Sequence, residues 1–163
     1  MTPINEPEIT NLDKLRSRLQ AESTDSLQLL RDIRDNPVCS IFFDESVPCI
    51  TVIRRNYATS TQLRFIHESI LHHLQEHGVN KVLGDDSALP TIHAEDQEWI
   101  IKEWLPRAMA AGLKATANKQ PLSHFGKVSV GNVQAGLPAG LVNRSFDRLE
   151  EARAWLHGVN LLS

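Results

Sequence analysis

The feature that most constrains the fold is a hydrophobic strand that leads through an acidic turn into a long amphipathic helix. The strand is predicted over Val79–Leu83 and the turn over Gly84–Leu89. The helix follows and ends at Gly112, after which Lys114–Asn118 is typical of a second short strand. A strand, a helix and a strand in this order form half of an α/β sandwich, so we expect an α/β fold.

The segment before this unit predicts a hairpin and a helix. The two runs Val38–Phe43 and Pro48–Arg54 are rich in β-branched and aromatic residues and flank a polar turn, as in a β-hairpin. A helix is predicted from Ser60 to Gly78, where glycine suits the left-handed position at a helix end. Its apolar side chains recur at helical spacing, which indicates a helix packed on a sheet; they are Leu63, Ile66, Ile70, Leu71 and Leu74.

The segment after the central unit is less regular. Residues 121–140 contain several glycines and Pro138, which interrupt the pattern of a helix, so an irregular helix or a loop is expected there. Leu141–Phe146 is typical of a last strand. Asp147 then has the position of an N-cap for a final helix over Arg148–His157.

The N-terminal part is predicted to be separate from the α/β domain. Residues 1–36 are expected to form a loose arm followed by a pair of amphipathic helices, and residues 37–163 the α/β domain. Helices added to a complete domain have to bury their leucines somewhere, and a subunit interface is a natural place. We therefore expect Leu15, Leu19 and Leu30 to lie in an interface, most simply that of a dimer.

Composition excludes some functions. The chain has 163 residues and a formal net charge of -3, which argues against a protein that binds nucleic acid through a dense basic surface. No apolar run reaches the roughly 18–20 residues of a membrane span, so stable membrane insertion is not expected. In the predicted hairpin, Cys49 lies opposite Phe42 and Cys39 opposite Val52, too far out of register for a disulfide. A reduced, cytoplasmic protein is therefore expected.

Several short motifs accompany this order of elements: Leu83-Gly-Asp-Asp86, Glu95-Asp-Gln-Glu-Trp99, Trp104-Leu-Pro-Arg107 with Ala111-Gly-Leu113, and Phe146-Asp-Arg-Leu-Glu-Glu-Ala-Arg-Ala-Trp-Leu156. Together with the order of elements, they resemble the STAS domain, the fold of anti-sigma-factor antagonists. They are most similar to the SpoIIAA-like, STAS/SEC14-type branch of small bacterial proteins. The likeness extends roughly over residues 38–156 and implies a mixed sheet that opens with an antiparallel hairpin and is packed by helices.

One motif of STAS switch proteins is missing. In those proteins a partner kinase phosphorylates the serine of an Asp-Ser pair at the start of the helix after the central strand. The corresponding place is about His93–Glu95, which has no hydroxyl group, and Ser87 lies earlier, in the turn. A phosphoserine switch adds negative charge at a helix N-terminus, where Glu95 and Asp96 already supply it. We therefore do not expect a phosphorylation switch.

Two groups of polar residues are candidate sites. Asp85 and Asp86 follow the central strand at its carboxyl end, where α/β sheets bind ligands, although aspartates in turns commonly bond their own backbone. His73 and His77 have the i, i+4 spacing of a metal pair. The chain has no His-Glu-x-x-His sequence and no obvious third ligand, so we interpret them as structural histidines beside an apolar stripe and expect no metal or other cofactor.

Two functions remain open, and neither is enzymatic. The first is a protein-interaction or regulatory module of the STAS-like type that binds a protein partner or a second copy of itself. The second is a carrier or sensor of a small apolar or lipid-like ligand, with the 121–140 segment as a mobile gate. The carrier requires a cavity lined by Trp104, Phe125 and Leu137. The alternative to such a cavity is that the tryptophans only fill the hydrophobic core.

Overall fold

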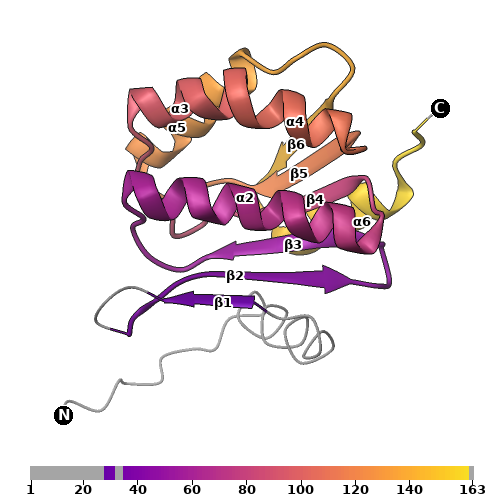
Figure 1. Ribbon diagram of the computed structural model, residues 1–163, viewed down its shortest axis with the longest axis horizontal. Coiled ribbons are helices and arrows are strands. Elements are labelled where there is room, and N and C mark those ends of the chain that lie inside the picture. The colour runs from indigo at the N-terminus through magenta and orange to yellow at the C-terminus, as the bar shows by residue number, and fades with distance from the viewer. Residues whose placement is uncertain (1–27, 32–34, 162–163) are drawn as a thin grey trace.

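A six-stranded mixed sheet forms the centre of the protein (Figure 1). The computed structural model describes residues 28–31 and 35–161. Neighbours in the sheet follow chain order, with antiparallel pairing from β1 to β3 and parallel pairing from β3 to β6. The strands are β1 Gln28–Arg31, β2 Pro37–Asp44, β3 Cys49–Arg54, β4 Lys81–Asp85, β5 Ala115–Lys119 and β6 Val142–Phe146. The mixed α/β sheet and the hairpin of β2 and β3 are as predicted, but this hairpin does not open the sheet, because β1 precedes it.

Helices pack on both faces of this sheet. They are α2 Ser60–His77, α3 Ala94–Trp99, the π-helix η2 Ile100–Trp104, α4 Leu105–Ala110, α5 His124–Ala135 and α6 Leu149–Gly158. The parallel strands are added in one direction, and right-handed crossovers then place each connecting helix on the same face. The connecting helices α2, α3–α4 and α5 therefore share one face, and α6 packs on the other (Figure 1).

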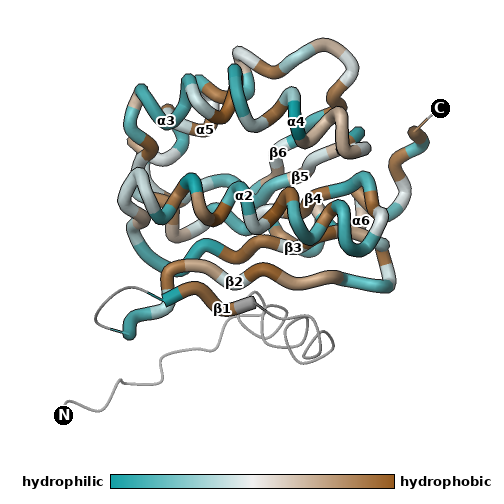
Figure 2. The backbone as a smooth tube through the Cα atoms, viewed as in Figure 1, coloured by the Kyte–Doolittle hydropathy of each residue, from teal (hydrophilic) through white to brown (hydrophobic). Residues whose placement is uncertain are grey.

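The sheet separates two hydrophobic cores. The first lies beneath α2, η2 and α4 and contains Ile41, Ile66 and Trp104, while the second lies beneath α6 and contains Phe42 and Leu156. Neighbouring residues of β2 thus point to opposite cores, as strand geometry requires. Both faces of the central strands are buried, which explains their nearly continuous hydrophobic character (Figure 2).

The ends of α2 are fixed by local sequence. Thr59 is the N-cap: its side chain accepts a hydrogen bond from the Gln62 N–H, and the Gln62 side chain accepts one from the Thr59 N–H. At the other end Gly78 has φ of 61°, the left-handed conformation that glycine adopts without a steric cost. The predicted helix from Ser60 to Gly78 is confirmed.

The predicted long helix exists but changes its geometry before Pro106. Proline has no N–H to donate, so a regular helix would lack a bond to the carbonyl of Lys102 at this point. The chain instead forms the π-helix η2, in which the N–H of Leu105 donates to the carbonyl of Ile100, five residues earlier. A π-helical segment between α3 and α4 therefore accommodates Pro106.

Residues 121–140 are more regular than the sequence indicated. They contain the 12-residue helix α5, whose N-cap Ser123 accepts a hydrogen bond from the Gly126 N–H. Gly126 allows close packing, since a Cβ there would lie 2.3 Å from the carbonyl oxygen of Leu89. The glycine that weakened the helical pattern is thus a packing residue inside a helix, and the expected gate contains an ordered helix.

Three local predictions are wrong. Gln28–Arg31 is not helical: it forms edge strand β1, whose Leu30 packs against the first core. Spacing of Leu27, Leu30 and Ile33 suited a helix, but pairing with β2 decides the structure. Leu15 and Leu19 lie outside the described residues.

The register of the β2–β3 hairpin differs from the predicted one, with Cys49 opposite Asp44 and Cys39 opposite Arg54. Both cysteines are free and buried. The N-cap position of the last helix is Arg148 rather than Asp147, and its side chain makes no capping hydrogen bond.

Candidate functional site

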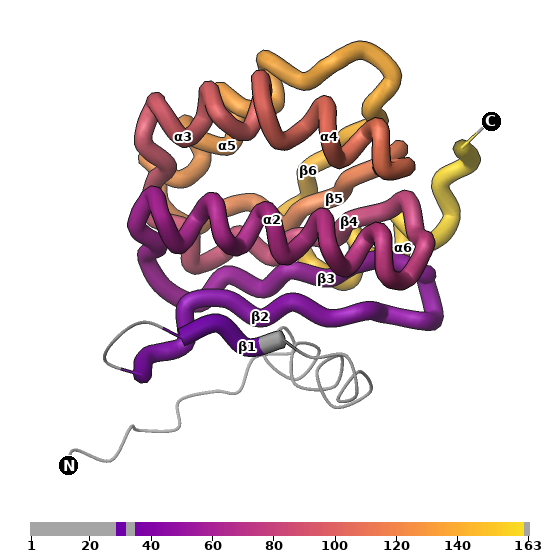
Figure 3. Tube along the Cα trace, in the orientation of Figure 1, coloured from indigo at the N-terminus to yellow at the C-terminus, as the bar shows by residue number. Residues whose placement is uncertain are grey.

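A cavity of about 160 Å³ lies between the sheet and the helices of its first face. Segments far apart in the sequence line it, from β3 to β6. The colours of Figure 3 show how far apart in the chain these two strands of the same sheet are. Most of its walls are aliphatic, with Trp104 at one side. The apolar lining residues include Val52, Ile70, Val82, Leu89, Ile92, Ile100, Leu105, Val130, Val133, Leu137 and Leu141.

One wall of the cavity is polar and begins at an ion pair. Arg54, the last residue of β3, has its Nε 3.5 Å from Oδ1 of Asp86, directly after β4. Asn118 on β5 donates from Nδ2 to Oδ2 of Asp86 at 3.1 Å and accepts from the Ser145 hydroxyl at 2.7 Å. Hydrogen bonds therefore connect β4, β5 and β6 across the sheet at their carboxyl ends, the edge where α/β proteins bind ligands.

The polar wall continues onto α5. Gln134 donates from its Nε2 to the Ser145 hydroxyl and to Oδ1 of Asn143, the latter at 3.0 Å. Asn143 in turn donates from Nδ2 to the Thr116 hydroxyl at 2.7 Å. One hydrogen-bond network thus joins six residues: Asp86, Asn118, Ser145, Gln134, Asn143 and Thr116. It holds α5 against the two last strands and fixes the directions of the amide groups at the cavity.

Asp86 is a shielded carboxylate. Its side chain is 15% exposed and that of Arg54 only 11%. Burial raises the pKa of Asp86, while Arg54 and the hydrogen bond from Asn118 oppose the rise. The site therefore holds an acid beside a guanidinium group in a setting with little water, where electrostatic interactions with a ligand are strong.

His67 on α2 supplies a different polar group. Its Nδ1 lies 2.9 Å from the carbonyl oxygen of Leu63, so this nitrogen carries the proton that is donated. Burial lowers the pKa of His67 to about 3, which leaves the ring neutral and Nε2 as an acceptor. The Trp104 indole N–H donates to the His67 carbonyl at 2.6 Å, and the two rings meet edge-on. This contact ties α2 to η2 at the cavity wall.

The structure brings together only some of the predicted site residues. Asp86, Trp104 and Leu137 all line the cavity. Asp85 does not: its Oδ1 accepts hydrogen bonds from the N–H and hydroxyl of Ser87, a turn of the kind expected for aspartate. Phe125 does not either, because its side chain is 72% exposed on the outer face of α5. Ser87 is buried, so its hydroxyl is not presented at the surface.

Sequence reasoning missed most of the polar wall. Arg54, His67 and Gln134 gave no distinctive pattern. A signal did exist in the alternation Thr116-x-Asn118 and Asn143-x-Ser145, because residues two apart in a strand point to the same face. Two polar pairs of this kind in neighbouring strands predict a shared polar patch.

Neither a scan against protein-family models nor a search of curated proteins finds a match to this chain. The STAS resemblance therefore stays an expectation from the sequence. Among the described residues, no helix combines the length and the apolar character needed to cross a bilayer.

Proposed function

We propose that the protein binds a small amphipathic molecule in this cavity, as a carrier or sensor. The observation that supports this function is the combination of aliphatic walls with one ordered polar wall at the carboxyl ends of the parallel strands. Ligand sites have this composition: mostly apolar surface with few placed polar groups that set orientation.

The volume of the cavity limits the size of the ligand. An engineered apolar cavity of about 150 Å³ holds benzene, whereas drug-sized ligands occupy pockets of roughly 300–1,000 Å³. At about 160 Å³ this cavity matches a molecule with a single ring or a short branched chain. A long acyl chain does not fit this volume, so a small ligand is a better candidate than a lipid.

The polar wall indicates how such a ligand would be oriented. Arg54 offers donors beside Asp86, and His67 offers an acceptor at Nε2 on the opposite, helical side. A ligand with a carboxylate or carbonyl group would place it toward Arg54 and its apolar body toward residues such as Ile70 and Val133. We therefore infer a small aromatic or branched acid as the preferred class.

The test is titration of the protein with benzoate, and with benzene as an uncharged probe, followed by amide NMR. Binding in the cavity predicts shifts at residues of β4, β5 and α5. Val133→Phe fills the cavity and should abolish them, whereas Val128→Phe, on the exposed side of the same helix, should leave them unchanged. Native mass spectrometry of freshly purified protein then looks for a bound molecule. Equal shifts in the wild type and Val133→Phe, or none in either, would contradict the proposal.

A second candidate is the interaction module, with a second copy of the chain as the partner. Leu122, two residues before α5, and Phe125 and Val128 within it recur every three residues and are 75%, 72% and 46% exposed. Exposed apolar side chains grouped in this way are typical of association surfaces. Phe125→Asp should lower the solution mass measured by sedimentation without loss of fold, since this side chain packs on no core. An unchanged mass would count against self-association through α5.

A further inference from the structure

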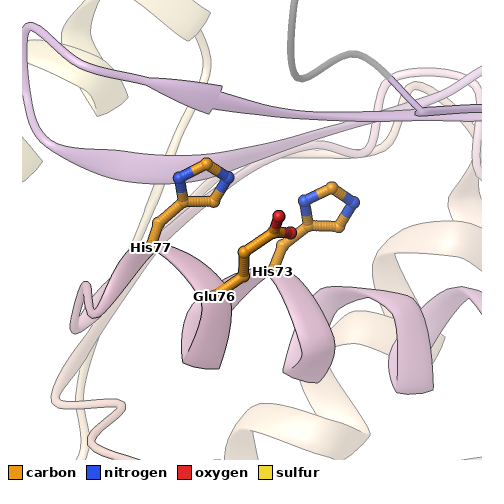
Figure 4. Close-up of side chains that lie close together, drawn as sticks. All are labelled: His73, Glu76 and His77. Atoms are coloured by element: carbon orange, nitrogen blue, oxygen red, sulfur yellow. The ribbon is translucent and has the colours of Figure 1, made fainter.

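The last turns of α2 gather three potential metal ligands away from the cavity. The sequence there is His73-Leu-Gln-Glu76-His77, with spacing i, i+3 and i+4 on one helix face. One potential ligand atom from each of the three side chains lies within 4.8 Å of the other two. Figure 4 shows the Glu76 carboxylate between the two imidazole rings, on the side of the helix next to the hairpin strands.

The order of these residues is that of a known class of zinc motif. His-x-x-Glu-His on a helix is found in zinc peptidases, where both histidines bind the metal and the glutamate between them is the general base, not a ligand. With Glu76 between the histidines, the same turn supplies two nitrogen donors and one carboxylate, the donor set of a His₂Glu zinc site.

The distances are close to those of a bound ion. Three atoms separated by at most 4.8 Å have a common centre at most about 2.8 Å from each of them. Zinc binds histidine nitrogen and carboxylate oxygen at about 2.0–2.2 Å, so each atom must approach by roughly 0.6–0.8 Å. Rotation about the side-chain bonds can supply a movement of this size. The three Cα atoms can stay in place, since they belong to one helix.

In this structure the two rings are parallel, and Glu76 is exposed to solvent. His73 is buried, with 7% of its surface exposed. The His77 ring stacks on Phe43 with 4.3 Å between centroids, and it lies parallel to the His73 ring at 6.1 Å. Glu76 is more than half exposed and lies 3.7 Å from His72, so its carboxylate can turn inward from solvent.

We propose that His73, Glu76 and His77 bind one zinc ion, with water at the remaining position. A lone pair lies in the plane of its imidazole ring, so both parallel rings have to turn toward the common centre. His77 thereby leaves its stack on Phe43, and the Glu76 carboxylate leaves His72. Zinc then closes the last turn of α2 through three side chains and stiffens the end of the helix beside the β2–β3 hairpin.

The experiment is a Zn²⁺ titration of untagged, chelator-treated protein in competition with a chromophoric chelator. Wild type should bind one equivalent. His77→Ala and Glu76→Gln should each weaken affinity at least tenfold, and both side chains are exposed enough for the fold to tolerate the change. The matched control is His157→Ala, an exposed histidine near the end of α6, which should bind as the wild type does.

X-ray absorption of the one-to-one complex provides a second measurement that does not depend on variants. Two imidazole ligands and oxygen donors at 2.0–2.2 Å are expected around the ion. Equal affinity of the wild type and His77→Ala, or a first shell without two imidazoles, would overturn the proposal. Circular dichroism of each variant confirms that a lost affinity does not reflect a lost fold.

Discussion

At the scale of single residues, His67 links the cavity wall to stability in acid. Its folded-state pKa is about 3, well below its ordinary value near 6.5, because burial disfavours the charged ring. Between these two values the unfolded chain binds a proton that the folded protein does not. Stability should therefore fall as the pH decreases from about 6.5 toward 3, by at most about 1.4 kcal/mol per pH unit for this one group.

His67→Gln isolates this effect, because glutamine does not titrate in that range. The variant loses ring contacts with Trp104 and should be less stable at pH 7, but its stability should decrease less steeply below pH 6.5. Urea unfolding at several pH values between 7 and 4 measures both curves. The depressed pKa of His73 contributes equally to both proteins and cancels in the comparison. Parallel curves would show that His67 is not the group responsible.

Asn118 is the residue on which the polar wall depends most. Its amide donates to Asp86 and its carbonyl oxygen accepts from Ser145. Asn118→Ala removes a hydrogen-bond partner from each of these groups, and we expect a loss of roughly 2–3 kcal/mol of unfolding free energy. Asn132→Ala, at an exposed position of α5, should change it by less than about 0.5 kcal/mol. Chemical denaturation of both variants gives the comparison.

At the scale of elements, two glycines of α5 should respond oppositely to the same substitution. A Cβ on Gly126 would lie 2.3 Å from a backbone oxygen of Leu89. Gly126→Ala should therefore displace α5 from the Leu89 loop and lower the free energy of unfolding by on the order of 2–3 kcal/mol. A Cβ on Gly131 meets no heavy atom within 4 Å. Gly131→Ala should therefore stabilise the protein by up to about 1 kcal/mol, the difference in helix propensity. Thermal unfolding of both variants tests the pair, and a destabilised Gly131→Ala would contradict this account.

These two positions also show what sequence can and cannot reveal about the elements. The helix α2 was predictable because its cap residues and its apolar stripe act locally. For α5 the sequence left an irregular helix and a loop both open. The reason is that Gly126 is required by its contact with a loop more than 30 residues away in the sequence. β1 has a leucine spacing compatible with a helix, and only its pairing with β2 makes it a strand. Local signals predicted local structure, whereas tertiary contacts decided the exceptions.

The residues of the candidate site also divide into those that the local sequence indicated and those that depend on tertiary contacts. The position of Asp86 at the end of a parallel strand pointed to the edge of the sheet where the cavity lies, and the tryptophan helix to one of its walls. Phe125 was misplaced because the orientation of α5 about its axis was unknown: Gly126, Val130 and Val133 face inward, and the neighbouring Phe125 faces outward. The network between β5 and β6 required knowledge of which strands are adjacent.

At the scale of the whole molecule, the two faces of the sheet have different roles. The face under α2, η2 and α5 contains the cavity and its polar wall. The face under α6 has a continuous core in which Phe42, Leu83 and Leu149 are buried almost completely. Substitutions on the α6 side should therefore change stability without changing a ligand site on the opposite side, which separates the two properties experimentally.

An ion pair on the α6 side joins distant parts of the chain. Arg153 on α6 donates to both carboxylate oxygens of Asp44 at the end of β2, at 2.8 and 3.3 Å, across 109 residues of sequence. Asp44 is 4% exposed, so Arg153→Met should leave its charge poorly compensated and lower stability by about 2 kcal/mol, less than for a fully buried pair because Arg153 is 25% exposed. Adding Asp44→Asn to Arg153→Met removes that charge. Urea unfolding of the two single variants and the double variant gives a double-mutant cycle. The double variant should lose less unfolding free energy than the two single variants lose together, whereas additive losses would mean that the two side chains contribute independently.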